Sequence, residues 1–295
     1  KGRASLPQSF TTELTGPKPP ERLFVVAVGV SKYKDADYNL GYASKDAQDL
    51  TKALQGLAPA GRVKTLKLLD SQVTREGFAK VRTFVEQATV DDRVVLFLAG
   101  HGLLDADNNY YFATSDVDFS NPTARGLRYE VVESVLDGIA ARKKLLLMDT
   151  CNSGEVEAGE QALPVPLTGG AIALKARGLK RKPSDKAPPA RSVTKDELRS
   201  FLGQLFADLR QQSGTVVISS ASGMEVALES SQWRNGAFTF ALLEGLHERK
   251  ADTDKNGTMM VSELRDYVFG RVRTLTGGLQ NPTVRQDLLR WDFGL

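Results

Sequence analysis

The chain has 295 residues, of which 41% are hydrophobic, so it can bury the core of one large domain or of two small ones. Its formal net charge of +3 is too small to indicate binding to nucleic acid or to a membrane surface, and we expect neither partner. A single cysteine excludes an intrachain disulfide framework and suits a reducing compartment, so we expect a cytoplasmic location.

No apolar run approaches the roughly 18 residues needed to span a membrane, and the first residues lack the charged start and apolar centre of a secretion signal. Residues 1–21 are rich in proline and predict an N-terminal arm or linker. Because the sequence opens on Lys1, we also allow for other domains of a longer chain.

Short apolar runs alternate with helical patterns from residue 22 onward. Continuous apolar runs predict strands at residues 23–30, 63–69, 93–99, 110–113 and 144–150. Apolar residues at spacings of three and four predict helices at residues 43–57, 74–85 and 131–139. This alternation predicts an α/β fold with a mainly parallel central sheet and helices on both faces.

The pattern changes after Gly154. Residues 155–193 carry proline, glycine and many basic residues with little periodicity, which predicts a basic flexible linker without regular structure. Beyond it, helices are expected at residues 194–209 and 238–246, and a strand at residues 215–220. The accessible Lys and Arg of the linker would suit a protease that prefers basic residues.

Two of the predicted strands end in residues suited to nucleophilic chemistry. His101 follows one strand and Cys151 follows another, and the carboxyl ends of parallel strands meet at one edge of a sheet. A thiol is a nucleophile only as thiolate, which a nearby histidine favours. The amide of Gly102 could donate to a developing oxyanion. Taken singly, each residue is explained as a buried thiol or a hydrogen-bonded loop histidine, but their shared position favours a catalytic pair.

At these residues the sequence resembles the caspase-like cysteine peptidases, and among them the metacaspases and their bacterial relatives, the orthocaspases. The resemblance is carried by Phe97-Leu-Ala-Gly-His-Gly102 and Leu147-Met-Asp-Thr-Cys-Asn-Ser-Gly154, with support from residues 23–33, 43–46, 217–221 and 236–245. It extends from about residue 22 to the end of the chain. Caspases have a histidine about 50 residues before the cysteine, as this chain does.

The resemblance implies a caspase-haemoglobinase-like sandwich and hydrolysis of peptide bonds through an acyl-enzyme on Cys151, with His101 transferring the proton. It divides residues 22–295 into a large-subunit-like part (22–154), the linker (155–193) and a small-subunit-like part (194–295). It also implies a zymogen that processes itself in the linker. A caspase-fold binding or scaffold module without catalytic activity is the alternative.

The resemblance also concerns the substrate. Animal caspases, which cut after aspartate, have glutamine two residues before the cysteine, whereas this chain has Asp149, and a carboxylate there would attract Arg or Lys. Asp46 matches a second metacaspase aspartate, although a solvated residue in the first turn of a helix is an equally good interpretation. Ser220 and Ala221 match the strand that pairs with the substrate backbone. Ala99 stands where metacaspases often have serine.

The loop at residues 252–263 fits the EF-hand pattern. It has oxygen ligands at positions one, three and five, glycine at six and an acid at twelve. Runs of Asp, Asn and Gly also form plain turns, and this loop is single although such loops usually come in pairs. The proteolytic chemistry requires no cofactor, so calcium would be an addition. The candidate calcium ligands are Asp252, Asp254, Asn256, Thr258 and Glu263.

Overall fold

The computed structural model describes residues 20–107, 109–150, 163–167, 170–177, 215–221, 227–285 and 292–295. Most of the predicted N-terminal arm, Cys151 and the predicted helix at residues 194–209 lie outside these ranges. Within these ranges, no helix is both long enough and apolar enough to cross a membrane.

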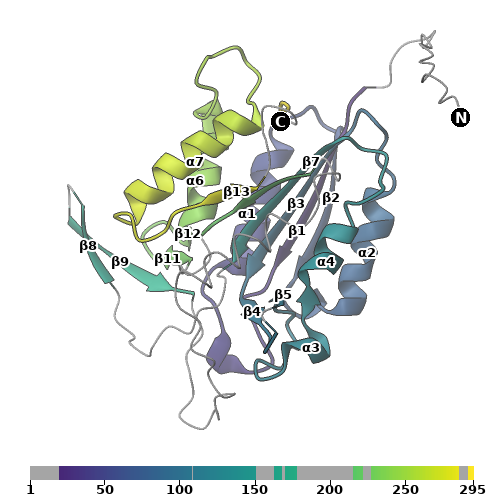
Figure 1. The fold of residues 1–295 in the computed structure, drawn as a ribbon. Helices are drawn as coiled ribbons and strands as arrows, with labels where there is room; N and C mark the ends of the chain where they lie inside the picture. The colour runs from purple at the N-terminus through teal and green to yellow at the C-terminus, as the bar shows by residue number, and fades with distance from the viewer. Residues whose placement is uncertain are drawn as a thin grey trace, which may run out of the picture.

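A six-stranded sheet forms the centre of the molecule, in the order β13-β10-β7-β3-β1-β2 (Figure 1). Its neighbours are parallel except for the antiparallel pair of β10 and β13, which confirms the mainly parallel sheet. β1 is buried along its whole length, as expected for an apolar strand covered on both faces. The strands are β1 (Leu23–Gly29), β2 (Val63–Leu69), β3 (Arg93–Gly100), β7 (Lys143–Thr150), β10 (Thr215–Ser219) and β13 (Thr283–Arg285).

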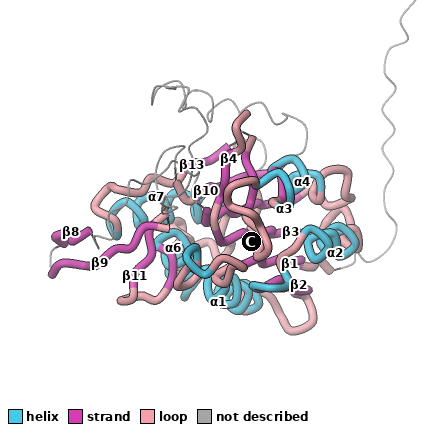
Figure 2. The backbone as a smooth tube through the Cα atoms, turned by 90° about the horizontal axis from the view of Figure 1, so that it is seen from below, coloured by secondary structure: helices cyan, strands magenta, loops and turns pink. Residues whose placement is uncertain are grey.

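Helices cover both faces of this sheet (Figure 2). On β1, an added Cβ at Gly29 would point at the Cβ of Ala47 in α1, 2.9 Å away, whereas Phe24 packs against Phe84 of α2. Positions 24 and 29 face opposite sides because side chains alternate along a strand. The helices are α1 (Ala43–Gln55), α2 (Arg75–Val85), α3 (Pro122–Arg125), α4 (Tyr129–Ser134), α6 (Ala237–Leu246) and α7 (Val261–Leu275), with 3-10 turns at Ala36–Tyr38, Asp70–Gln72 and His247–Arg249.

Helix boundaries follow local signals. Thr74 caps α2, because its hydroxyl accepts a hydrogen bond from the amide of Gly77 at 3.0 Å. The helix predicted at residues 131–139 is wrong in its bounds, since α4 ends at Ser134. Gly138 has φ of +67°, a left-handed conformation that cannot continue a helix.

Two small sheets flank the central one. A three-stranded sheet contains β4 (Gly102–Leu104), β5 (Tyr110–Phe112) and β6 (Leu127–Arg128). A four-stranded sheet has the order β12-β11-β9-β8 and contains β8 (Leu163–Leu167), β9 (Gly170–Ala176), β11 (Leu228–Ser230) and β12 (Asn235–Gly236).

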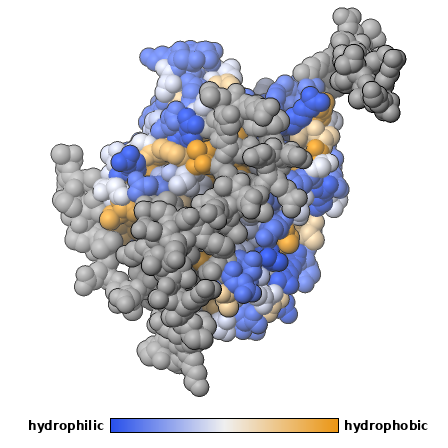
Figure 3. Space-filling view, in the orientation of Figure 1, coloured by the Kyte–Doolittle hydropathy of each residue, from blue (hydrophilic) through white to orange (hydrophobic). Residues whose placement is uncertain are grey.

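The hairpin of β8 and β9 corrects the prediction that residues 155–193 lack regular structure. Pro164 and Pro166 concealed it, because proline argues against a strand in a sequence. β8 is the outermost strand of its sheet, where proline is tolerated. On the face of the molecule seen in Figure 3, hydrophilic residues cover most of the described surface, as expected when the apolar runs form the core.

Candidate active site

β3 and β7 are neighbours, and their register brings the two candidate catalytic positions to one level. Gly100 pairs with Thr150 in parallel register, so His101 and Cys151 are the next residues along adjacent strands. Adjacent strands lie about 4.8 Å apart. Cys151 lies outside the described residues, and Thr150 is fixed by the Tyr110 hydroxyl, which donates to its Oγ1 at 2.7 Å.

The His101 ring is buried and oriented by a backbone carbonyl. Its Nε2 lies 2.8 Å from the Tyr38 carbonyl oxygen, which can only accept a hydrogen bond, so Nε2 carries the proton in the neutral ring. Nδ1 is therefore the basic nitrogen. The rings of Tyr33 and Phe119 pack around the imidazole, with centroids 5.2 and 5.7 Å away. A carbonyl thus takes the orienting role that a carboxylate has in a catalytic triad.

The surroundings of His101 keep it neutral. Burial is the main cause and lowers its pKa to about 4, assisted by the charge of Arg177, whereas hydrogen bonds to the backbones of Tyr38 and Arg177 raise it. At neutral pH the ring is thus available as a proton acceptor.

Gly102 lies at a position where its amide can donate a hydrogen bond to a ligand. The amide of Ala113 donates to the His101 carbonyl at 2.9 Å, which makes that pair a hydrogen-bonded one in the ladder of β4 and β5. Gly102 is opposite Phe112 at the next, non-hydrogen-bonded position. Its N–H therefore points away from β5.

Asp46 and Asp149 meet in the interior, where a third carboxylate, Glu229, joins them. All three surround the guanidinium of Arg177, which is completely buried. Nη2 contacts Asp46, Nη1 lies 3.3 Å from Asp149 Oδ2, and Nε lies 3.0 Å from Glu229 Oε2. We call Asp46, Asp149 and Glu229 the carboxylate site. Its three acceptors match the three nitrogens of one guanidinium.

Neighbouring groups fix the carboxylates in place. Asn235 Nδ2 donates to Asp46 Oδ1 at 2.8 Å, the Thr239 hydroxyl donates to Asp149 Oδ2 at 2.6 Å, and the Gly41 amide donates to Glu229 Oε1 at 3.1 Å. These donors come from α6, β12 and the segment before α1. The site is therefore held by elements far apart in the sequence.

Comparison with known proteins identifies the family. The sequence matches the family model described as the caspase domain over residues 22–293. The chain belongs to the caspase-domain family. The expected caspase-haemoglobinase-like fold is thereby confirmed. A comparison with curated proteins gave no match.

Among solved structures, the caspase domain is similar to protein GSU0716 from Geobacter sulfurreducens. The two share 15% sequence identity, with 92% of this chain and 97% of that chain covered, at a TM-score of 0.57. At this identity the similarity concerns the fold alone.

Charge and burial oppose each other in the carboxylate site of this caspase domain. Burial chiefly, together with the charge of Asp149, raises the pKa of Asp46 to about 6, while Arg177 counteracts the rise. Despite its burial, the three carboxylates raise the pKa of Arg177 well above its ordinary value. A permanently charged group is thus the natural occupant.

The sequence pattern did not reveal Glu229 or Arg177. Glu229 is an acid within a short apolar stretch, and Arg177 is one of many basic residues in the predicted linker, so neither stands out. The backbone of Ser220 is used within the fold, with its amide donating to Met148 O at 2.8 Å and its carbonyl accepting from Gln280 at 2.8 Å. Ala221, next to it, is buried. β11 pairs with β9, which ends at Ala176, one residue before Arg177.

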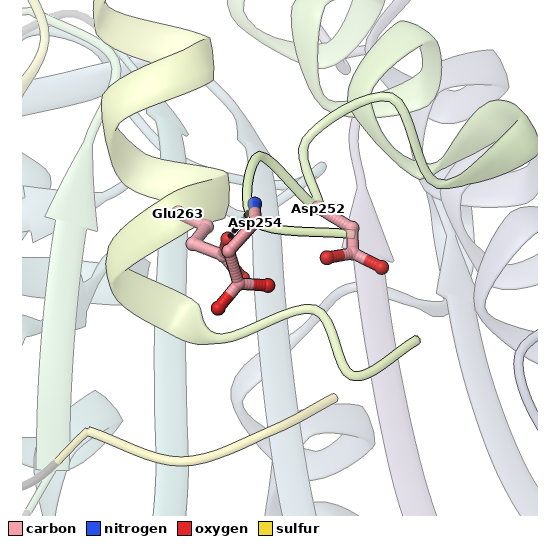
Figure 4. A group of neighbouring side chains, drawn as sticks. All are labelled: Asp252, Asp254 and Glu263. Carbon is pink, nitrogen blue, oxygen red and sulfur yellow. Dashed lines mark hydrogen bonds between the residues drawn. The ribbon is translucent and has the colours of Figure 1, made fainter. Parts of the chain in front are cut away.

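The loop predicted to bind calcium has a compact arrangement of acids (Figure 4). One oxygen each from Asp252, Asp254 and Glu263 lie within 4.8 Å of one another. Oxygens on opposite sides of one calcium ion lie about 5 Å apart, so this spacing fits. Asp252 is only 9% exposed and its Oδ1 has no hydrogen-bond partner among the described residues, which is a costly state for a carboxylate oxygen.

The two remaining candidate ligands lie in the same loop. Asn256 Oδ1 accepts a hydrogen bond from the amide of Thr258 at 2.7 Å. Gly257, at position six, has φ of +85°, and its amide donates to Asp252 Oδ2 at 2.9 Å. The donor set is entirely oxygen and therefore suits a hard cation.

Proposed function

We propose that this caspase domain is a cysteine endopeptidase that cleaves proteins after Arg or Lys, made as a zymogen that processes itself between residues 155 and 193. One observation carries the specificity. Three buried carboxylates enclose an arginine side chain, Arg177, and one of them, Asp149, lies two residues before Cys151. An arginine of a substrate has the same chemistry and would make the same contacts.

In the reaction, the Cys151 thiol gives its proton to His101 Nδ1 and attacks the carbonyl carbon of the substrate Arg. The Gly102 amide stabilises the oxyanion. His101 then protonates the leaving amine as the peptide bond breaks, and a thioester remains on Cys151. Water hydrolyses the thioester and releases the new carboxylate.

The carboxylate site favours Arg over Lys and excludes Asp. A planar guanidinium offers donors to three acceptors at once, whereas an ammonium is a single point charge. An aspartate would add a fourth negative charge to Asp46, Asp149 and Glu229. We therefore expect peptides ending in Arg to be cleaved faster than peptides ending in Lys, and peptides ending in Asp not to be cleaved detectably.

The first prediction is that Asp149→Asn lowers kcat/KM for peptides ending in Arg at least about 100-fold, because it removes one of the three charges that balance a buried guanidinium. Fluorogenic peptides ending in Arg, Lys or Asp measure this. Asp107→Asn, at an exposed turn, is the matched control and should leave the rate unchanged.

Cys151→Ala tests the chemistry in the same assay. Hydrolysis by wild type that disappears in Cys151→Ala supports the enzyme. Equal signals from both proteins would favour the catalytically silent binding module. Preference for Asp would contradict the role of the carboxylate site.

We also propose that residues 252–263 bind calcium through Asp252, Asp254, Asn256, Thr258 and Glu263. The buried oxygen of Asp252 that lacks a partner supports this assignment. The loop is braced from outside, since the Leu295 amide donates to Met259 O at 2.9 Å. It also runs into the first turn of α7, which packs on α6, the helix that carries Thr239 of the active site.

The second prediction is that calcium at about 100 times its Kd stabilises the protein by about 2.7 kcal/mol, which raises the thermal midpoint by roughly 5 °C. Asp252→Asn should abolish the shift, whereas Asp266→Asn, on exposed α7 surface, should retain it. Thermal unfolding and titration calorimetry of Cys151→Ala measure it without self-cleavage. Absence of binding heat and of any midpoint shift in the parent would contradict the calcium site.

A further inference from the structure

We infer that the chain presents its own residues 174–177 to its active site as substrate, so that the bond between Arg177 and Gly178 is the one it cuts in itself. The inference rests on the proposed function, and it names the residue and the manner of self-processing. It is drawn from the position of Arg177, which the described contacts fix on three sides.

The backbone before Arg177 is bound as an extended peptide at a sheet edge. β9 pairs antiparallel with β11, with Ala176 opposite Leu228 and Lys175 opposite Glu229. The ladder continues to Arg177, whose amide donates to Ala227 O at 2.9 Å. Addition of a strand to an edge is a common mode of peptide recognition by proteins. Figures 1 and 2 both show β9 beside β11, with the β8–β9 hairpin extending outward.

Two side chains of this segment have partners in the fold. Leu174 packs on Leu228 and Arg177 is completely buried in the carboxylate site, whereas Lys175 is exposed. Arginine is almost never fully buried unless it is paired, because removing a charge from water is costly. Here the partners are the residues that would recognise an arginine of any other substrate.

The guanidinium of Arg177 lies next to the strand that leads to the nucleophile. Nη1 lies 3.3 Å from Asp149 Oδ2 and 3.5 Å from the backbone oxygen of Asp149, two residues before Cys151. His101 follows Gly100, which pairs with Thr150 on the adjacent strand. The arginine is therefore bound beside the two strand ends that carry the catalytic residues.

The cut consumes one water molecule and needs no other reactant. The Cys151 sulfur forms a bond to the carbonyl carbon of Arg177, and the bond from that carbon to the Gly178 nitrogen breaks. The proton taken from the thiol passes through His101 to that nitrogen, which becomes a new amino terminus. Water then splits the thioester, restores the thiol and leaves a carboxylate on Arg177.

The experiment follows self-cleavage of the full chain by mass spectrometry of intact protein and of its peptides. Wild type should yield a fragment that ends at Arg177 and one that begins at Gly178, and Cys151→Ala should yield neither. Arg177→Ala should slow cutting at this bond at least about 100-fold, whereas Arg177→Lys should retain it. Lys175→Ala, an exposed basic residue of the same strand, is the matched control and should cut normally. The rate should be independent of protein concentration, because the substrate is part of the same chain.

A peptide ending in Arg is added to the same samples to distinguish failure of the inference about Arg177 from failure of the proposed function. If wild type hydrolyses this peptide through Cys151 but no fragment ends at Arg177, the inference is wrong and the proposed function stands. The same conclusion follows if Arg177→Ala is processed like wild type. If neither the peptide nor the chain is cut, the proposed function fails as well.

Discussion

Glu229 supplies one of the three acceptors for the arginine side chain, and removal of its charge should weaken binding of the substrate. The third prediction is that Glu229→Gln raises KM for peptides ending in Arg roughly tenfold with a smaller change in kcat, because the residue contacts Nε of the guanidinium and takes no part in the proton transfer. Steady-state kinetics with Arg peptides measures the separation. Glu248→Gln, with an exposed side chain, is the control. A fall in kcat with unchanged KM would contradict this role.

His101 makes stability depend on pH. Its pKa is about 4 in the folded protein and about 6.5 when unfolded, so the unfolded chain binds the proton more readily. The contribution of His101 to the free energy of unfolding is therefore fully present above pH 6.5 and is lost as the pH falls toward 4. The shift corresponds to about 3 kcal/mol.

The fourth prediction is that His101→Gln removes this part of the pH dependence. Urea unfolding of Cys151→Ala at pH 7 and pH 4 should give a stability difference about 3 kcal/mol larger with His101 than with glutamine. His247, whose side chain is 67% exposed, supplies the control His247→Gln. Equal pH dependence in the His101→Gln variant would show that burial does not depress the pKa of His101.

At the scale of elements, the start of α6 forms one wall of the carboxylate site. An added Cβ at Gly236 would lie 2.6 Å from Asp149 Oδ2 and 2.8 Å from Arg177 Nη2. The fifth prediction is that Gly236→Ala lowers kcat/KM for Arg peptides at least about tenfold by displacing the guanidinium, as measured in the peptide assay. Gly270→Ala, with nothing within 4 Å, should leave kcat/KM unchanged and stabilise α7 by up to about 1 kcal/mol. Equal activity of Gly236→Ala and wild type would mean that arginine binds elsewhere.

The central elements could be predicted because their signals are local. β1, β3 and β7 are continuous apolar runs, and α1 and α2 have apolar residues at helical spacing. The β8–β9 hairpin could not be predicted, since its prolines argue against strands and its pairing with β11 joins residues about 50 positions apart. Long-range pairing of this kind leaves no periodic pattern in either segment.

The candidate site shows the same division. His101 could be found from its position at a strand end and Asp149 from its place two residues before Cys151 in the family motif, and both are local properties. Glu229 and Arg177 were missed because their importance comes only from contacts: Arg177 lies 131 residues from Asp46 and 52 from Glu229 in the sequence. The composition of the linker concealed one specific arginine among many basic residues.

At the scale of the molecule, a cut after Arg177 should not separate the two parts of the chain. β10, which follows the cut, lies between β7 and β13 in the central sheet, and α6 packs on α1. We expect the two fragments to elute together in size-exclusion chromatography and to separate only in denaturant. Separate elution under native conditions would contradict the single central sheet.

The most direct test of the proposed specificity is covalent trapping with peptidyl chloromethyl ketones that end in Arg or in Asp. We expect the Arg reagent to add its mass to Cys151, as located by peptide mass spectrometry, and the Asp reagent to add none under the same conditions. Asp149→Asn should slow the labelling, and Asp107→Asn should not. Labelling by the Asp reagent at an equal rate, or failure of Cys151 to react with the Arg reagent, would contradict the pairing of an acidic specificity site with a nucleophilic cysteine.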